Sequence, residues 1–546
     1  MCRRRTLDAR RSIIATQAFA VPREDWSCHA QCAILRGMRF IRALEAWDTI
    51  RARPGYRLWG VVLSAGLAAV VYATARSAVS HEAAGAAAMT TLMAVWWLGG
   101  VMPMAVTAAV PLVMMPALGL GAVAEVAALY ADPLNVLMLG GFLLAFAMEE
   151  VDLHARVVRA LLAPAWVRSS PRRMAFALMV AAACVSAFIN NTATMLMMLP
   201  TAMLLAKACG DAPRVRSAFV LVTAYACSIG GVGTLVGTAP NAVLAGLAPR
   251  VAGVQLGFVT WMAVGVPFVL LALPLAWWVV THVTLPLPST VETPPERPKQ
   301  HAWSRSERIV AVAMASCLTL WLTRSPLDVG GLRWPGWGGW FPSKVDDGYV
   351  AIAIVLGLFM LPGDKPGTLD RHIVAATHGD DAGEDAFLLS WRRASRAVPW
   401  SVLVLMGGGF AMAQAVTTSG LSAALAGSIA SLGALPPTLQ VFAISVGIAF
   451  LSAFTSNTAT TQLALPLLGA GAVAAGVPPL LWMVPATIAA SCDFALAVGT
   501  PPNAIAAEAG GVRASDMAYA GVLLNVVCAG VTTLVVLVIG RAVLVH

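Results

Sequence analysis

Charged residues are scarce in this chain of 546 residues. Only 12% of the chain is Asp, Glu, Lys or Arg, whereas 59% is hydrophobic. Soluble globular proteins carry about 25% charged residues, so this composition excludes a soluble protein of such length. Apolar stretches near the ~20-residue length of a membrane-spanning helix recur along the chain. We therefore expect an all-α polytopic membrane protein with roughly ten to twelve spans, most simply about 11 transmembrane helices, some of them broken.

The chain also lacks the residue patterns of a metal centre or a catalytic site. Its nine cysteines form no disulfide or zinc pattern, and its eight histidines show no metal-ligand spacing. No nucleophile, general base and orienting group occur together near the repeated motifs described below. We therefore expect neither enzymatic activity nor an organic cofactor.

Positive charge is not distributed as in a nucleic-acid-binding protein. The net charge is +9, but most Lys and Arg lie beside apolar stretches, where they set membrane topology. Residues 1–57 contain twelve Arg and five acids, without the apolar core and cleavage site of a secretory signal. We expect a basic cytoplasmic N-terminal segment on a plasma-membrane protein. An upstream-extended start would also explain residues 1–37, which have neither a membrane nor a globular pattern.

A pair of motifs occurs twice in the chain. Residues 186–200 are SAFINNTATMLMMLP and residues 452–466 are SAFTSNTATTQLALP, an offset of 266. Residues 237–242 (GTAPNA) recur at 499–504 (GTPPNA) with an offset of 262, and Gly141-Phe142 recurs at Gly409-Phe410 with an offset of 268. The nearly constant offset indicates two homologous halves with polar residues inside apolar stretches. This pattern is typical of a secondary transporter with a shared central site.

The placement of arginine predicts how the repeats meet the membrane. Arg172 and Arg173 precede the stretch 174–206 and Lys207 follows it, so both flanks are cytoplasmic by the positive-inside rule. The stretch is too short for two spans, and we expect a re-entrant hairpin at about 174–206. A second hairpin, at about 440–472, has no charge near either end and would enter from the outer face. The halves then form an inverted repeat.

A segment rich in proline and charge, residues 286–308, separates the two halves. Its composition favours a cytoplasmic linker. The first membrane half is then expected over residues 58–285 and the second over 309–546.

The repeated motifs contain helix-breaking polar residues but no Lys or Arg. Asn190-Asn191-Thr192 and Ser456-Asn457-Thr458 are natural caps for the second helix of each hairpin, and a helix N-terminus attracts anions. Gly237–Asn241 and Gly499–Asn503 break two further helices and free carbonyl oxygens that suit a hard cation such as sodium. The residues that support these breaks are Pro240, Asn241, Pro501, Pro502 and Asn503. A dianion would be neutralised by helix dipoles, side-chain donors and bound cations.

These motifs, with LGGFLLAFAMEEVDLHARVV at 139–158 and WRRASRAVPWSVLVLMGGGF at 391–410, resemble those of the divalent anion/sodium symporter family, the di- and tricarboxylate and sulfate carriers. The resemblance covers most of the chain from about Trp59 onward. It implies a homodimer in the lipid bilayer, each protomer having a scaffold domain and a transport domain that moves as an elevator. The substrate contacts it implies are Asn191, Thr192, Thr238, Ser456, Asn457, Thr458 and Thr500. The sodium ligands it implies are Ser186, Asn190, Asn191 and Gly237 at one site and Ser452, Ser456, Asn457 and Gly499 at the other.

The resemblance implies sodium-coupled symport of small dianions, and we expect C4 dicarboxylates such as succinate, malate or fumarate. The family has Ser where this chain has Asn190, which either replaces a sodium ligand or only caps the hairpin. A sodium-independent dicarboxylate exchanger and a sulfate transporter therefore stay open as alternatives. A channel-like or sensory protein that binds the anion is the alternative from another class. Asp493, just before the second break, is either paired structurally or part of cation or proton coupling.

Overall fold

The computed structural model describes residues 54–291, 301–329, 332–341, 345–364 and 387–541. Residues 1–53 of the predicted N-terminal segment and residues 292–300 of the predicted linker lie outside the described residues. The chain divides into two compact units, residues 1–62 and 63–546, and the architecture below is that of the second unit. The described residues are helical apart from one short antiparallel pair of strands.

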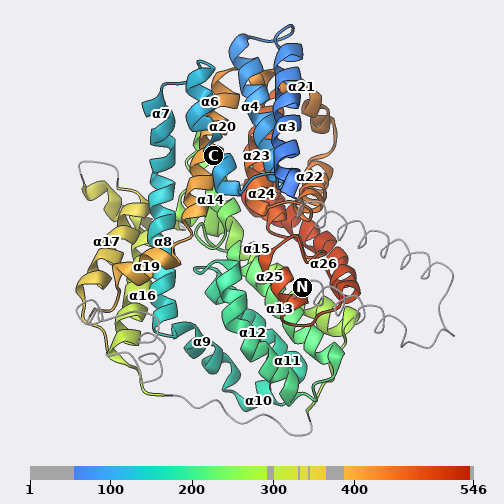
Figure 1. Ribbon diagram of the computed structural model, residues 1–546. Coiled ribbons are helices and arrows are strands. Elements are labelled where there is room, and N and C mark those ends of the chain that lie inside the picture. Colours follow the sequence, from blue (N-terminus) through green and yellow to red (C-terminus); the bar gives the residue numbers. More distant parts are fainter. Residues whose placement is uncertain (1–53, 292–300, 330–331, 342–344, 365–386, 542–546) are drawn as a thin grey trace, which may run out of the picture. The chain divides into compact units, whose positions relative to one another are not determined.

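The helices of the first half are numbered in chain order (Figure 1). They are α3 (Pro54–Ala75), α4 (His81–Gly99), α5 (Met104–Ala108), α6 (Val110–Ala117), α7 (Val123–Ala128), η1 (Leu129–Ala131), α8 (Pro133–Glu150), α9 (Leu153–Leu162), α10 (Ala165–Arg168), α11 (Pro171–Ser186), α12 (Asn191–Ala208), α13 (Pro213–Gly231), α14 (Ala239–Val251), α15 (Phe258–Trp278) and η2 (Val279–Thr284).

The second half begins after the linker. Its elements are α16 (Arg305–Arg324), β1 (Leu327–Val329), β2 (Leu332–Trp334), η3 (Trp337–Trp340), α17 (Asp347–Met360), α19 (Trp391–Ala397), α20 (Trp400–Thr418), α21 (Leu421–Ala430), η5 (Ser431–Ala434), α22 (Pro437–Ser452), α23 (Asn457–Ala474), α24 (Leu480–Ala490), α25 (Pro501–Glu508), α26 (Ala514–Val535) and η6 (Val536–Gly540). The helix α16 begins at Arg305, within the stretch 286–308 that is predicted to be the linker.

The order of helices repeats between the halves, as the motif offsets predict. The helix pair α11–α12 corresponds to α22–α23, and each pair is interrupted by four residues, 187–190 and 453–456. The helices α13 and α14 correspond to α24 and α25. The long helices α15 and α26 both continue into a π-helical turn, η2 and η6, and pack against each other. The duplication seen in the sequence is therefore also present in the fold.

Local sequence sets where these helices begin. Proline occupies one of the first two positions of α11, α13, α22 and α25, where its missing N–H costs nothing. Ser304 and Glu307 form a reciprocal capping box at the start of α16, with Ser304 Oγ 3.0 Å from the Glu307 nitrogen. These caps satisfy amide groups that a helix leaves free at its N-terminus.

Helices that follow the motifs pack across the two halves. The second helix of the first hairpin, α12, packs against α25 of the second half, and α14 of the first half packs against α23 (Figure 1). Each half also packs its own hairpin against its own next helix, α11 and α12 against α13, α22 and α23 against α24. The four helices that carry the repeated motifs are thus joined in crossed pairs.

Six helical stretches among the described residues are long and apolar enough to cross a membrane. They are Gly55–Ala75, Val123–Glu150, Phe258–Thr284, Arg305–Arg324, Trp400–Thr418 and Ala514–Gly540. Four shorter apolar helices accompany them: Met104–Ala117, Asp347–Met360, Pro437–Ser452 and Leu480–Ala490. The total number of spans stays a prediction, because broken helices fall below the length of a single span.

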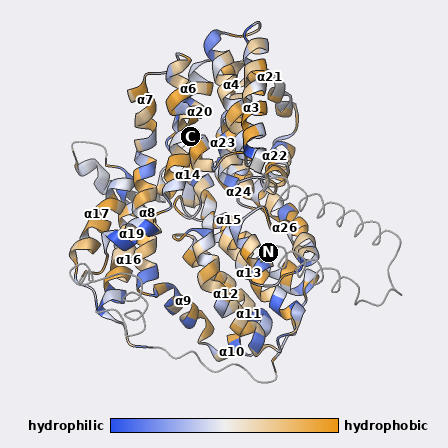
Figure 2. Cartoon of the chain, viewed as in Figure 1, coloured by the Kyte–Doolittle hydropathy of each residue, from blue (hydrophilic) through white to orange (hydrophobic). Residues whose placement is uncertain are grey.

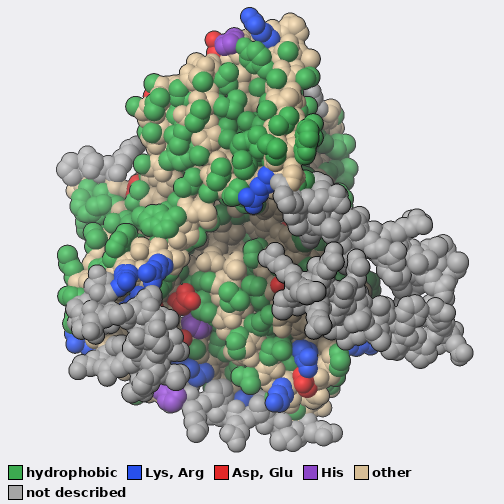
Figure 3. All heavy atoms as spheres, in the orientation of Figure 1, with side chains coloured by type: hydrophobic (Ala, Val, Ile, Leu, Met, Phe, Trp, Pro, Cys, Tyr) green, Lys and Arg blue, Asp and Glu red, His purple; other side chains and the backbone are tan. Residues whose placement is uncertain are grey.

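The outer surface of the second unit is largely apolar. Large hydrophobic side chains such as Val113, Leu204, Leu270 and Phe450 are between 67% and 72% exposed. Hydrophobic residues predominate along most helices in Figure 2, and charged side chains are sparse on the face shown in Figure 3. A surface of this kind is stable when lipid covers it.

Candidate functional site

The break in the first hairpin is held by side chains of the repeated motif. The Asn190 side chain accepts a hydrogen bond from the Ala193 nitrogen (2.9 Å) and so caps α12. The Ser186 hydroxyl lies 2.8 Å from Oδ1 of Asn191 and 2.7 Å from the carbonyl oxygen of Cys227 in α13. The first contact closes the break within the hairpin, and the second ties the break to the neighbouring helix α13.

A second break follows α13 and lies against the hairpin. The Asn241 amide group donates to the carbonyl oxygens of Gly231 (3.0 Å) and Thr234 (2.7 Å). A β-carbon on Gly237 would stand 2.5 Å from the Gly231 oxygen and 2.9 Å from the Ser186 oxygen, so only glycine fits there. A β-carbon on Gly231 would stand 2.5 Å from Oδ1 of Asn191. We call the four residues Ser186, Asn191, Gly231 and Gly237 the first polar cluster.

The second half repeats this arrangement. The Ser452 hydroxyl lies 3.0 Å from Oδ1 of Asn457 and 2.9 Å from the carbonyl oxygen of Ala490. The Asn503 amide group donates to the carbonyl oxygens of Asp493 (2.9 Å) and Leu496 (3.1 Å). A β-carbon on Gly499 would stand 2.5 Å from Oδ2 of Asp493. The residues Ser452, Asn457, Asp493 and Gly499 form the second polar cluster.

Threonines from the motifs lie at the starts of the four motif helices. Thr192 and Thr458 are half-buried in the first turns of α12 and α23. Thr238 and Thr500 are the N-cap residues of α14 and α25, and Thr500 Oγ1 accepts a long hydrogen bond (3.4 Å) from the Asn503 nitrogen. Ser456 takes the N-cap position of α23 without a side-chain cap bond. Hydroxyl groups at helix N-termini suit the recognition of a carboxylate.

The predicted site residues therefore form one group in each half of the chain. Within each half the serine, asparagine and glycine predicted as sodium ligands make one connected cluster. Between the halves, the helices that carry these residues pack against each other, α12 with α25 and α14 with α23. Asn190 differs from the others because its side-chain oxygen is engaged in the helix cap.

No positive side chain belongs to either polar cluster. The basic residue at the end of α14, Arg250, lies in an ion pair with Asp132 (2.7 Å) ahead of α8 and over the ring of Phe410. Its charge is therefore committed to the contact between α14 and α8. Anion binding at the clusters would depend on helix N-termini, hydroxyl groups and cations.

Two members of the clusters were not among the predicted site residues. Gly231 was missed because a lone glycine near a helix end carries little signal. Asp493 was singled out, but its position inside the cluster was not predicted. Applying the 262-residue offset to Asp493 gives Gly231, and this correspondence is the signal that could have placed both.

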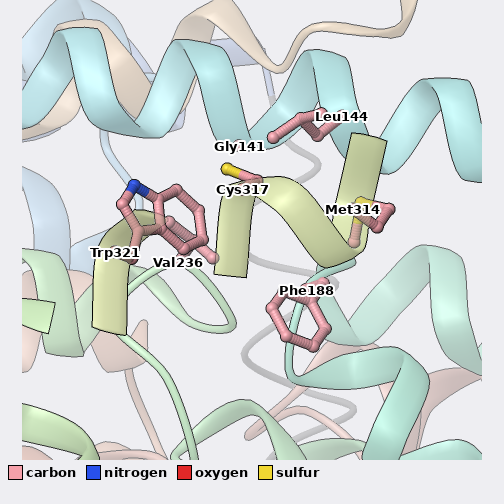
Figure 4. A pocket seen from close by; sticks show the side chains of 7 residues that line it. All are labelled: Gly141, Leu144, Phe188, Val236, Met314, Cys317 and Trp321. Atoms are coloured by element: carbon pink, nitrogen blue, oxygen red, sulfur yellow. The ribbon is translucent and has the colours of Figure 1, made fainter. Parts of the chain in front are cut away.

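A small apolar pocket adjoins the first cluster (Figure 4). Gly141 and Leu144 of α8 and Met314, Cys317 and Trp321 of α16 line it, together with Phe188 and Val236 from the two breaks of the first half. A β-carbon on Gly141 would stand 3.1 Å from Val236 Cγ1, so the repeated glycine at this position lets α8 approach the break. The lining of the pocket is apolar and offers no partner for an anion. The pocket therefore lies at the edge of the site, where helices pack against it.

Duplicated broken helices, apolar spanning helices and paired polar clusters define a helical membrane transporter with an internal repeat. A family model described as "Citrate transporter" matches residues 93–487. The sodium-dependent dicarboxylate transporter SdcS of Staphylococcus saprophyticus is 33% identical over 465 residues, covering 82% of this chain and 84% of that protein. SdcS of Staphylococcus aureus strain USA300 is 33% identical over 466 residues with the same coverage.

The chain therefore belongs to the divalent anion/sodium symporter family. It is a multi-pass membrane protein. A crystal structure of the YdaH transporter of Alcanivorax borkumensis shares its fold, with a TM-score of 0.51 and 17% identity, covering 77% of this chain and 88% of that one.

Proposed function

We propose that the protein is a secondary active transporter that carries C4 dicarboxylates such as succinate, malate or fumarate across the plasma membrane together with sodium. The observation that carries the proposal is the pair of polar clusters, each built from a hairpin break and a second helix break. Their oxygen atoms suit a hard cation, and four helix N-termini beside them suit an anion. The sodium-dependent dicarboxylate transporters that match most of the chain support the same substrate and ion.

The first sodium site would be formed by Ser186, Asn191 and Gly237, and the second by Ser452, Asn457 and Gly499. Asn190 and Ser456, at the N-caps, complete the predicted ligand sets through their backbone or side-chain oxygens. The dicarboxylate would be held by Asn191, Thr192, Thr238, Ser456, Asn457, Thr458 and Thr500. Sodium on either side would offset the negative charge of the substrate, so the two would bind cooperatively.

The capped state of Asn190 favours symport over sodium-independent exchange. Its side chain satisfies the Ala193 amide, while the contacts among Ser186, Asn191 and Gly237 stay like those of the second half. The first cluster therefore keeps the serine, asparagine and glycine that the second one has. Exchange would require that the first site be disabled, and its geometry supports the opposite.

Movement would follow an elevator mechanism in a homodimer. In this proposal both hairpins and the helices α13, α14, α24 and α25 move together, because the crossed packing joins them into one body. The N-terminus would be cytoplasmic, and the two hairpins would enter from opposite faces of the membrane. Crosslinking of single-cysteine pairs between protomers would test the dimer.

Uptake of radiolabelled succinate into proteoliposomes tests the function. The purified protein is assayed with and without an inward sodium gradient, and with and without internal dicarboxylate. Symport predicts sodium-stimulated, saturable accumulation into empty vesicles, inhibited by malate and fumarate. Uptake that depends only on internal dicarboxylate would instead identify an exchanger. Competition by sulfate or citrate, but not by malate, would show that the substrate is not a C4 dicarboxylate.

A further inference from the structure

Asp493 is a completely buried carboxylic acid without a hydrogen-bond partner. Its side chain is 0% exposed, and neither carboxylate oxygen accepts a hydrogen bond among the described residues. The Asn457 side chain is close enough to interact with it, but no hydrogen bond of good geometry joins the two. An isolated buried carboxylate is strongly unfavourable, so such a group is normally paired or coordinates a metal ion. The side chain therefore needs a partner that the described part of the chain does not supply.

The carboxylate lies inside the second polar cluster. Its Oδ2 atom would be 2.5 Å from a β-carbon on Gly499, and the Asp493 backbone oxygen is held by Asn503 at 2.9 Å. Asn457, the third neighbour, is fixed by its contact with the Ser452 hydroxyl at 3.0 Å. Two of the residues beside Asp493, Asn457 and Gly499, are thus among those predicted to hold the second sodium ion.

The first half provides an internal comparison. The 262-residue offset places Gly231 at the position of Asp493 and Asn241 at the position of Asn503. Asn241 donates to the Gly231 oxygen at 3.0 Å, and Asn503 donates to the Asp493 oxygen at 2.9 Å. The two backbones therefore have the same arrangement, and the clusters differ by one carboxylate group.

Among the described residues, no basic side chain forms an ion pair with Asp493. The ion pairs among the described residues involve other acids, such as Asp132 with Arg250 and Asp347 with Arg324. The helices α22 and α23, which carry Ser452 and Asn457, contain no charged residue. A structural ion pair, which would be the simplest explanation of a buried acid, is not present among the described residues.

We propose that Asp493 is an anionic ligand of the second cation site, which makes this site formally negative while the first site is neutral. The inference rests on the proposed function for the identity of the ion. Because a carboxylate strengthens cation binding, the second site should hold sodium before any dicarboxylate is present. The first site, which lacks a charge, should fill mainly when the dianion is bound.

Thermal unfolding of the purified full-length protein tests this without transport. Sodium chloride is titrated against choline chloride at constant ionic strength and without dicarboxylate, and the unfolding midpoint is followed. The wild-type midpoint should rise with sodium. In Asp493→Asn, which keeps the shape of the side chain, the sodium concentration for the half-maximal rise should increase at least about tenfold.

Two further variants serve as matched controls. Asp347→Asn removes another buried acid and should lower the midpoint while keeping the wild-type sodium response, because Asp347 is paired with Arg324. Asp493→Gly gives the second cluster the residue of the first, and its sodium response should be weakened at least about tenfold, as in Asp493→Asn. If Asp493→Asn does not fold, Asp493→Gly decides.

The outcomes separate this inference from the proposed function. A wild-type sodium response in both Asp493 variants would overturn the ligand role, even if the wild-type protein carries succinate with sodium. A half-maximal sodium concentration at least about tenfold higher in both variants would support it, even if the wild-type protein moved another anion. A midpoint of the wild-type protein that does not respond to sodium would also overturn it.

Discussion

Asn241 and Asn503 perform the same task at equivalent places in the two halves. The Asn241 amide group donates to Thr234 at 2.7 Å, and the Asn503 amide group donates to Leu496 at 3.1 Å. Each asparagine is completely buried, and each also binds the carbonyl oxygen of the residue ten positions earlier. A broken helix can persist at membrane depth because one side chain replaces several missing backbone hydrogen bonds.

Replacing either asparagine should destabilise the protein. Asn241→Ala leaves at least two buried carbonyl oxygens unpaired, and an unpaired buried group costs about 1–3 kcal/mol. We expect a loss of at least about 2 kcal/mol for Asn241→Ala and for Asn503→Ala. The measurement is the free energy or midpoint of unfolding in detergent. Thr319→Ala is the control, because the Thr319 hydroxyl is exposed and bonds only within its own helix. Unchanged midpoints for both asparagine variants would contradict this account.

Asn457→Ala should abolish transport while the protein stays folded. The substitution removes the oxygen that lies 3.0 Å from the Ser452 hydroxyl, and with it a proposed ligand of both sodium and substrate. Radiolabelled succinate uptake measures the effect, and size-exclusion chromatography reports folding and assembly. Ser445→Ala is the matched control in the same hairpin, since Ser445 is buried and bonds only to Val441 in its own helix. Near-normal uptake by Asn457→Ala would show that the site lies elsewhere.

Substitutions of Asn190 separate a capping role from a coordinating one. Asn190→Ala removes the cap on the Ala193 amide and should cost about 1 kcal/mol, whereas Asn190→Ser keeps a good capping side chain. The sodium concentration for half-maximal uptake should stay within about threefold of wild type in both variants, because the expected loss is one of stability. A rise above about tenfold in Asn190→Ala alone would make the side chain a sodium ligand.

Gly237→Ala should disrupt the first polar cluster. The new β-carbon would stand 2.5 Å from the Gly231 oxygen and 2.9 Å from the Ser186 oxygen, both of them backbone atoms that cannot rotate away. We expect loss of transport and a lower unfolding midpoint. Gly447→Ala in α22 is the control, because a β-carbon there meets nothing within 4 Å and alanine favours a helix by about 0.5–1 kcal/mol. Equal behaviour of the two variants would exclude the close approach as the reason for Gly237.

The local structure of the site could largely be predicted from the sequence. The repeated Asn-Thr and Gly-Thr motifs indicate helix breaks because they combine capping residues with proline and glycine, and the structure has breaks at these places. The length of α16 was less well defined, since its polar first turn, Arg305 to Arg308, gives no apolar signal. Capping by Ser304 and Glu307 explains why the helix nonetheless begins there.

Long-range relationships were not predictable from local patterns. That α12 packs against the other half's α25 depends on how the whole chain folds, and no periodicity within α12 encodes it. The same holds for the carboxylate of Asp493, whose burial at the second cluster could be inferred only once the two halves had been aligned residue by residue. The number of spans was also ambiguous, because helix breaks and short helices weaken the signal that length provides.

The crossed packing of the motif helices has a consequence for biosynthesis. During translation α12 and α14 leave the ribosome long before α23 and α25. The first half therefore enters the bilayer before these two packing partners exist. A chain that ends in the linker lacks α25 and α23, against which α12 and α14 pack in the complete protein. Completion of the C-terminal half then supplies the packing partners that the N-terminal half needs for its native form.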